Sequence, residues 1–114
     1  MIEWRVPFTV PCQHPCYADH FPGHVVVPGA LLLEWIQQAL QQHCPDVRMQ
    51  AIVSFKFLRV VEPGDFLEMH FRLAEDNSSV QIDCVRIDDS MNDNLNNSMS
   101  VSVAKGKWLL GVVA

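Results

Sequence analysis

The sequence predicts an α+β domain in which an antiparallel sheet packs against one long helix. One strand-like segment, residues 2–10, precedes a single helical segment, and four strand-like segments follow it in succession. Such an order of elements favours a sheet of sequentially connected strands with the helix on its face. A chain of 114 residues is long enough for one domain with a real core, so we expect residues 1–114 to fold as one unit.

The segment before the helix divides into a strand and a loop. Residues 2–10 are rich in β-branched and aromatic side chains, and Pro11 ends this run. Residues 11–28 contain four prolines and a glycine, which exclude long regular structure. We therefore expect a wrapping loop there.

The helix is predicted to begin at Pro28, because proline loses nothing in the first turn, and to end near His43, just before Pro45. Apart from Glu34, nearly two turns of it carry no polar side chain, as the apolar residues are Leu31, Leu32, Leu33, Trp35 and Ile36. A helix that is apolar all round must be buried all round. We expect a sheet curled around it, a dimer, or both.

The remaining strands are predicted at residues 49–61, 66–75, 79–88 and 98–113. The third of them alternates clearly, with Val80, Ile82 and Ile87 set against polar neighbours. The sequence EPGD at residues 62–65 predicts a tight turn, because Pro63 presets one φ angle and Gly64 can adopt a positive one.

Composition excludes several classes of function. The net charge of −5 argues against nucleic acid as the main partner, since phosphate binding needs a basic face. No apolar run approaches the roughly 18–20 residues that cross a bilayer, so no membrane segment is expected. The first residues, MIEWRVPF, do not resemble a signal peptide, and we expect a cytoplasmic protein. The four cysteines are too few and too irregularly spaced for a disulfide framework.

Three groups around the helix start could act together on a thioester. His20 can serve as a base near neutral pH. Glu34, placed between Leu33 and Trp35, would hold a proton in apolar surroundings and act as an acid. Gly29 offers a backbone N–H with the helix dipole behind it, which can polarise a carbonyl oxygen. An elimination beside a thioester needs a base, an acid and a carbonyl donor of this kind.

The stretch HFPGHVVVPGALLLEWIQQ, residues 20–38, closely resembles the signature of the β-hydroxyacyl-acyl-carrier-protein dehydratases of fatty acid synthesis. Their signature is a GHFPG loop, a Pro-Gly pair, a helix that carries an acid, and Gln four residues after the acid. The matching positions here are His20, Phe21, Pro22, Gly23, Pro28, Gly29, Glu34 and Gln38. A second segment, KFLRVVEPGDFLEM at residues 56–69, resembles the later strand–PGD–strand segment of the family.

The resemblance implies the hot-dog fold, in which an antiparallel sheet wraps around one long central helix. It also implies a homodimer or higher homo-oligomer, with the His of one subunit and the acid of the other in each site at the interface. By the same resemblance, His20 abstracts the α proton and Glu34 protonates the departing 3-hydroxyl. The Gly29 N–H would hold the thioester oxygen, and Gln38 would orient Glu34. The product would be a trans-2-enoyl thioester.

The resemblance further assigns substrate contacts and partners. Phe21 and Pro28 would join Gly29 and Gln38 in binding the substrate, and no cofactor is implied. The acyl group would be carried on acyl carrier protein or coenzyme A. The short chain favours an accessory enzyme that serves a specialised lipid, polyketide or aryl-polyene pathway. An acyl carrier is strongly acidic, which makes Lys56 and Arg59 candidates for a basic docking patch.

Other interpretations stay open at this point. A hot-dog thioesterase would use the helix acid to activate water, and a non-catalytic acyl-binding partner subunit would fit the departures from the signature. These departures are Asp19, where the family usually has Gly, and Val25, where it often has Pro. The Cys and His residues of positions 12–24 lack the Cys-x2-Cys spacing of zinc sites, so we expect no metal.

Overall fold

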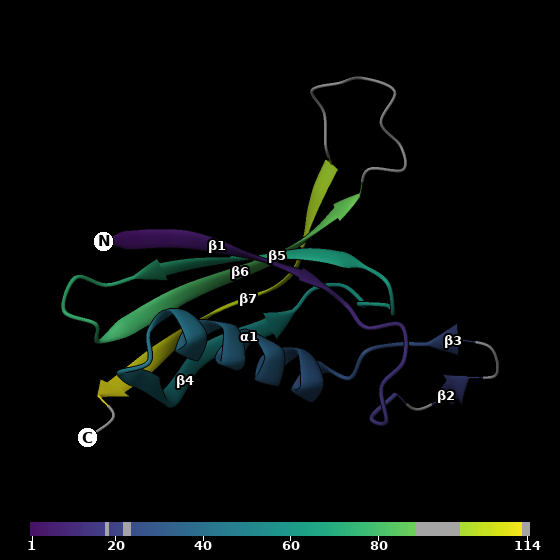
Figure 1. Cartoon of the computed structure of the whole chain (residues 1–114), viewed down its shortest axis with the longest axis horizontal. Helices are drawn as coiled ribbons and strands as arrows, with labels where there is room; N and C mark the ends of the chain where they lie inside the picture. The colour runs from purple at the N-terminus through teal and green to yellow at the C-terminus, as the bar shows by residue number, and fades with distance from the viewer. Residues whose placement is uncertain (18, 22–23, 89–98, 113–114) are drawn as a thin grey trace.

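In the computed structural model, five long strands form one antiparallel sheet that lies over a single helix (Figure 1). The structure describes residues 1–17, 19–21, 24–88 and 99–112, and for residues 19–21, 24, 88 and 99 it describes the backbone alone. The strands of this sheet lie in the order β1 (Ile2–Thr9), β5 (Phe66–Leu73), β6 (Ser79–Asp88), β7 (Met99–Val112) and β4 (Val47–Phe57). The predicted α+β class is confirmed.

The helix α1 (Gly29–His43) begins one residue after the predicted start and ends where the sequence predicts. Its side chains Leu31, Leu32, Ile36, Ala39 and Leu40 are buried against the sheet. Alternate residues of each strand meet them: in β5 the buried residues are Leu67, Met69, Phe71 and Leu73. The core therefore lies between one face of α1 and the inner face of the sheet.

One chain does not bury the helix all round. Glu34 and Gln38 are exposed, while Leu33 and Trp35 are half-buried. Trp35 packs against Phe8, with ring centroids 5.0 Å apart, so the side of α1 away from the sheet is covered only in part. The expected complete burial is therefore absent from the part of the chain that the structure describes, and a dimer remains the other expectation.

The turn predicted at residues 62–65 is present. The Asp65 N–H donates to the Glu62 carbonyl oxygen at 3.1 Å, and the Glu62 N–H donates to the Asp65 Oδ2 at 2.8 Å. Gly64 has a φ of 88°, a conformation that glycine adopts without steric cost. This turn leads directly into β5.

A small hairpin interrupts the segment that was expected to be a loop. Its strands are β2 (Asp19–Phe21) and β3 (His24–Val25), and it extends beyond the N-terminal end of α1, clear of the large sheet (Figure 1). The loop expectation was wrong for these five residues. No helix among the described residues is long and apolar enough to cross a membrane.

Candidate active site

The start of α1 is fixed by backbone contacts on both sides. Pro28 precedes the helix with φ −60° and ψ 141°, and its carbonyl oxygen accepts from the N–H groups of Leu31 and Leu32 at 3.1 and 3.2 Å. The Val27 N–H donates to the Val61 carbonyl oxygen at 2.8 Å, which ties the helix entry to the segment after β4. The first turn is thereby held in one orientation.

Gly29 presents a backbone N–H at this start. The first N–H groups of a helix have no partner within the helix, and no described residue caps this end with its side chain. The N-terminal end of a helix also carries partial positive charge. The Gly29 N–H can therefore donate to a carbonyl oxygen that develops negative charge, as the sequence predicts.

Phe57 packs directly on Gly29. A Cβ atom built on Gly29 would lie 2.9 Å from the Cζ atom of Phe57 and 3.1 Å from both Cε atoms. The Phe57 ring meets Phe55 edge-on, with centroids 5.1 Å apart, and Phe55 packs against the buried Trp108 at 5.9 Å. A series of aromatic rings thus links the core to the helix start, and only glycine fits beneath the last ring.

The sequence alone did not single out this contact. Phe57 is half-exposed, at 51% of its surface, although it packs on the helix start. The signal available in the sequence is the strand–PGD–strand segment, but the strand predicted at residues 49–61 puts Phe57 in its interior, whereas β4 ends at Phe57. Nothing in the spacing shows that the end of β4 meets the start of α1.

Glu34 lies on the open side of α1, five residues after Gly29. Gln38 follows one turn later, and its Nε2 donates to the Glu34 Oε1 at 3.4 Å. The predicted pairing of these side chains is therefore present. The apolar enclosure expected for Glu34 is absent among the described residues, because this residue is exposed.

The backbone of His20 lies in β2, on the hairpin that extends past the helix end (Figure 1). The side chains of His20 and Phe21 are outside the described atoms, and their predicted roles stay predictions. The two departures from the family signature face one another here: Asp19 pairs with Val25 across the β2–β3 ladder. The described backbone of β2 and β3 lies beyond the N-terminal end of α1 and not alongside the helix (Figure 1).

The loop before the hairpin is anchored by Tyr17. Its hydroxyl donates to the Pro11 carbonyl oxygen at 2.7 Å, and burial raises the pKa of Tyr17. Two cysteines that precede Tyr17 in this loop, Cys12 and Cys16, are exposed free thiols. Among the residues that the structure describes, no three His, Cys, Asp or Glu side chains are placed to hold a metal ion.

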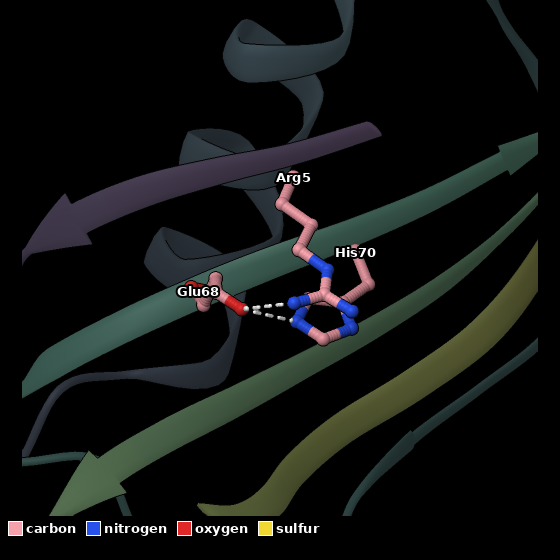
Figure 2. Close-up of polar contacts among 3 residues, drawn as sticks. All are labelled: Arg5, Glu68 and His70. Carbon is pink, nitrogen blue, oxygen red and sulfur yellow. Dashed lines mark hydrogen bonds and ion pairs between the residues drawn. The ribbon is translucent and has the colours of Figure 1, made fainter. Parts of the chain in front are cut away.

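A second polar cluster lies away from the helix start, on the outer face of the sheet. Figure 2 shows Arg5 and His70 both pointing at one carboxylate oxygen of Glu68. The Glu68 Oε1 is 2.7 Å from the His70 Nε2 and 3.6 Å from an Arg5 guanidinium nitrogen. The cluster joins β1 to β5 and belongs to a larger charged surface.

Comparison with known proteins places this geometry in context. The chain is 31% identical over 87 residues to a 3-hydroxyacyl-[acyl-carrier-protein] dehydratase of Anaeromyxobacter sp. (strain Fw109-5). The matched region covers 66% of this chain and 53% of that relative. The chain thus spans about half the length of that relative.

Two solved structures share the fold. The dehydratase heterocomplex ApeI:P from Xenorhabdus doucetiae superposes with a TM-score of 0.72 at 18% identity, over 95% of this chain and 86% of that one. A hexameric hot-dog fold thioesterase of Campylobacter jejuni gives a TM-score of 0.65 at 14% identity, over 96% and 81% of the two chains. The hot-dog fold implied by the sequence resemblance is confirmed.

The decisive match is at the level of family. The sequence profile of the ApeI-like family, described as ApeI dehydratase, matches residues 2–94. These residues include both strands of the hairpin, all of α1 and the segment that carries Phe57. The chain belongs to the ApeI-like family of dehydratases.

Proposed function

We propose that this protein is a dehydratase that eliminates water from a (3R)-hydroxyacyl thioester, carried on acyl carrier protein, in the cytoplasm. Family membership supports the reaction class, and the start of α1 supports the chemistry. The observation that carries the proposal is that the Gly29 N–H, which no described side chain caps, and the acid Glu34 lie on one short stretch of helix. A helix rises 1.5 Å per residue, so the two lie about 7.5 Å apart along its axis.

The steps of the elimination follow from these groups. The Gly29 N–H binds the thioester oxygen and stabilises the negative charge that develops when the α proton leaves. His20 takes that proton, and the electron pair of the broken C–H bond forms the new double bond as the C3–O bond breaks. Glu34 gives its proton to the departing hydroxyl. Water and a trans-2-enoyl thioester are the products.

Gln38 has a positioning role in this scheme. Its Nε2 donates to one carboxyl oxygen of Glu34, which fixes the carboxyl rotamer and leaves the second oxygen for the substrate hydroxyl. Phe21, at the end of β2, and Pro28, just before α1, are assigned to the substrate pocket. No cofactor is required by this chemistry.

We infer that each site is completed by a second copy of the chain. The hairpin that bears His20 extends away from its own helix, and Glu34 lies on a side of α1 that its own sheet does not cover (Figure 1). The edge strand β4 and the segment after it carry exposed apolar side chains: Ile52, Val53, Phe57, Leu58 and Val60. A partner that covers this edge would bury Glu34 and bring its own His20 to it.

The test is turnover of a 3-hydroxyacyl thioester with two simultaneous readouts. The proposal predicts a rise in enoyl-thioester absorbance without release of free thiol. A thioesterase is the second candidate, because the fold is shared with the Campylobacter jejuni enzyme. Release of free thiol without enoyl product would establish that candidate instead and refute the dehydratase.

The specialised pathway is part of the proposal. We propose that this ApeI-like chain serves an accessory lipid, polyketide or aryl-polyene route. A preference for a short or aryl-substituted 3-hydroxyacyl group over long saturated chains, measured as kcat/KM, would support this assignment. Turnover of long saturated chains alone would contradict it.

A further inference from the structure

Two rows of polar side chains cross the whole outer face of the sheet, opposite the helix. In each row the residues are direct cross-strand partners from β1 to β4. The first row is Arg5, His70, Asp83, Lys105 and Lys56, and the second is Glu3, Arg72, Gln81, Lys107 and Ser54. All ten line one groove of about 660 Å³. Five strands spaced about 4.8 Å apart make it roughly 19 Å long.

The two ends of the groove differ in how their charges are compensated. On β1 and β5, Arg72 is bound to Glu3 at 2.9 Å and Arg5 lies 3.6 Å from Glu68. On β7 and β4, Lys56, Lys105 and Lys107 have no carboxylate within 4 Å among the described residues. The cationic charge at the β4 end is therefore free to meet an external anion.

The neighbours of these lysines compensate their charge only in part. Lys56 and Lys105 face each other directly across the β4–β7 ladder, a like-charge pair that costs stability. Asp83, the cross-strand partner of Lys105 on β6, accepts a hydrogen bond from the Ser102 hydroxyl at 2.7 Å. An anion bound between the lysines would relieve this repulsion.

The groove is also the main basic surface of an acidic protein. It holds five of the eight Lys and Arg residues of a chain whose net charge is −5. An acidic partner would be repelled by most of the surface and attracted here, and complementary patches of this kind steer association and fix orientation.

We propose that the β4 end of this groove docks the acidic surface of the acyl carrier protein that delivers the substrate. This proposal rests on the function proposed above. Lys56 is the penultimate residue of β4, and Phe57, the last, contacts Gly29 on the opposite face. A carrier held at Lys56, Lys105 and Lys107 therefore sits beside the end of β4, the strand whose last residue packs on the helix start.

This places the docking surface differently from the sequence prediction. Lys56 keeps its predicted role, whereas Arg59 is not among the residues that line the groove. The two lysines of β7 take part instead, because the β4–β7 pairing brings them beside Lys56. The lysines of β7 lie about fifty positions after Lys56 in the chain, so the sequence alone does not predict that they are neighbours.

The experiment measures binding of a fluorescently labelled holo acyl carrier protein to the full chain by anisotropy at low salt. The test variant is Lys107→Glu, whose cross-strand neighbours Ser54 and Gln81 are uncharged, so the fold is preserved. Lys56→Glu is the second variant, because it gains an opposite charge across from Lys105. The matched control is Arg48→Glu, an exposed reversal on the same strand outside the groove.

We expect each lysine reversal to weaken carrier binding by about tenfold, because it removes an attraction and adds a repulsion. Arg48→Glu should change the affinity by less than about twofold, and raising the salt should weaken binding of the wild type. Equal affinity of the wild type and both lysine variants would overturn the proposal. So would a change of molar mass in Lys107→Glu, which would identify the groove as a contact between copies.

Failure of the docking proposal is distinguishable from failure of the proposed function. Binding is measured without turnover, and turnover is measured separately with the acyl group on N-acetylcysteamine, which has no acidic surface. Wild-type protein that dehydrates this small thioester while the lysine variants bind carrier unchanged would refute the docking surface alone. Carrier binding at the lysines with no enoyl product from either substrate would refute the dehydratase alone.

Discussion

Replacing Gly29 by Ala should slow the reaction far more than it destabilises the fold. The new Cβ would lie 2.9 Å from the Phe57 ring, whereas carbons at optimal contact are about 3.5–4.0 Å apart. The ring or the helix start must therefore move by roughly 0.6–1.1 Å. Because the half-exposed ring can turn outwards, we expect the free energy of unfolding to change by less than about 1 kcal/mol.

A shift of the helix start also moves the Gly29 N–H relative to the thioester oxygen that it is proposed to bind. A shift of about 1 Å at a reacting centre can cost about a hundredfold in rate, so we expect kcat to fall between tenfold and a hundredfold. The assay follows enoyl formation from an N-acetylcysteamine thioester, with urea unfolding run in parallel. Gly111→Ala is the matched control, because its Cβ would meet Gln50 at an ordinary 3.6 Å.

A second substitution separates crowding from other effects of alanine. In the Gly29→Ala/Phe57→Leu double variant the ring is gone, so part of the lost activity should return relative to Gly29→Ala. Full activity of Gly29→Ala with an unchanged fold would refute the idea that the ring and the N–H position the substrate. Equal loss of activity in Gly111→Ala would refute it as well.

Two further predictions concern the core. Burial raises the pKa of the Cys84 thiol to about 12. Iodoacetamide at pH 8 should therefore modify the exposed Cys12 and Cys16 but reach Cys84 only in urea. Rapid labelling of Cys84 in the native protein would contradict this prediction. The unfolded thiol ionises from about pH 9 while the folded one stays protonated, so its contribution to the free energy of unfolding should decline above pH 9. Trp108→Ala should cost about 3–5 kcal/mol by urea denaturation, because this side chain is fully buried. The adjacent exposed Leu109→Ala should cost clearly less, and equal costs would show that the two strand faces are wrongly assigned.

The fold could be predicted from the sequence where local signals agree. Pro28 and Pro45 bracket the helix, and the alternation along residues 79–88 matches the bounds of β6. The strand predicted at residues 49–61 instead runs from Val47 to Phe57. The Leu58 and Arg59 N–H groups both donate to the Val103 carbonyl oxygen, which ends the regular ladder, although β-branched Val60 and Val61 favour a strand.

The candidate site was less accessible to sequence reasoning, for physical reasons. The pairing of Glu34 with Gln38 was implied by the family resemblance, whereas the contact of Phe57 with Gly29 depends on how β4 ends against the helix. The density of prolines and the glycine favoured a loop where the backbone forms the β2–β3 hairpin. The apolar setting expected for Glu34 is absent among the described residues of one chain, where Glu34 is exposed.

The central claim is that this chain is a dehydratase whose sites are shared between two subunits. It is tested most directly by mixing two inactive variants, His20→Ala and Glu34→Ala, under conditions that let subunits exchange. A dimer formed from one chain of each kind contains one intact site, so random exchange predicts recovery of about one quarter of the wild-type rate of enoyl formation. A mixture that exchanges subunits, as shown by mass measurement, yet stays inactive would contradict the account.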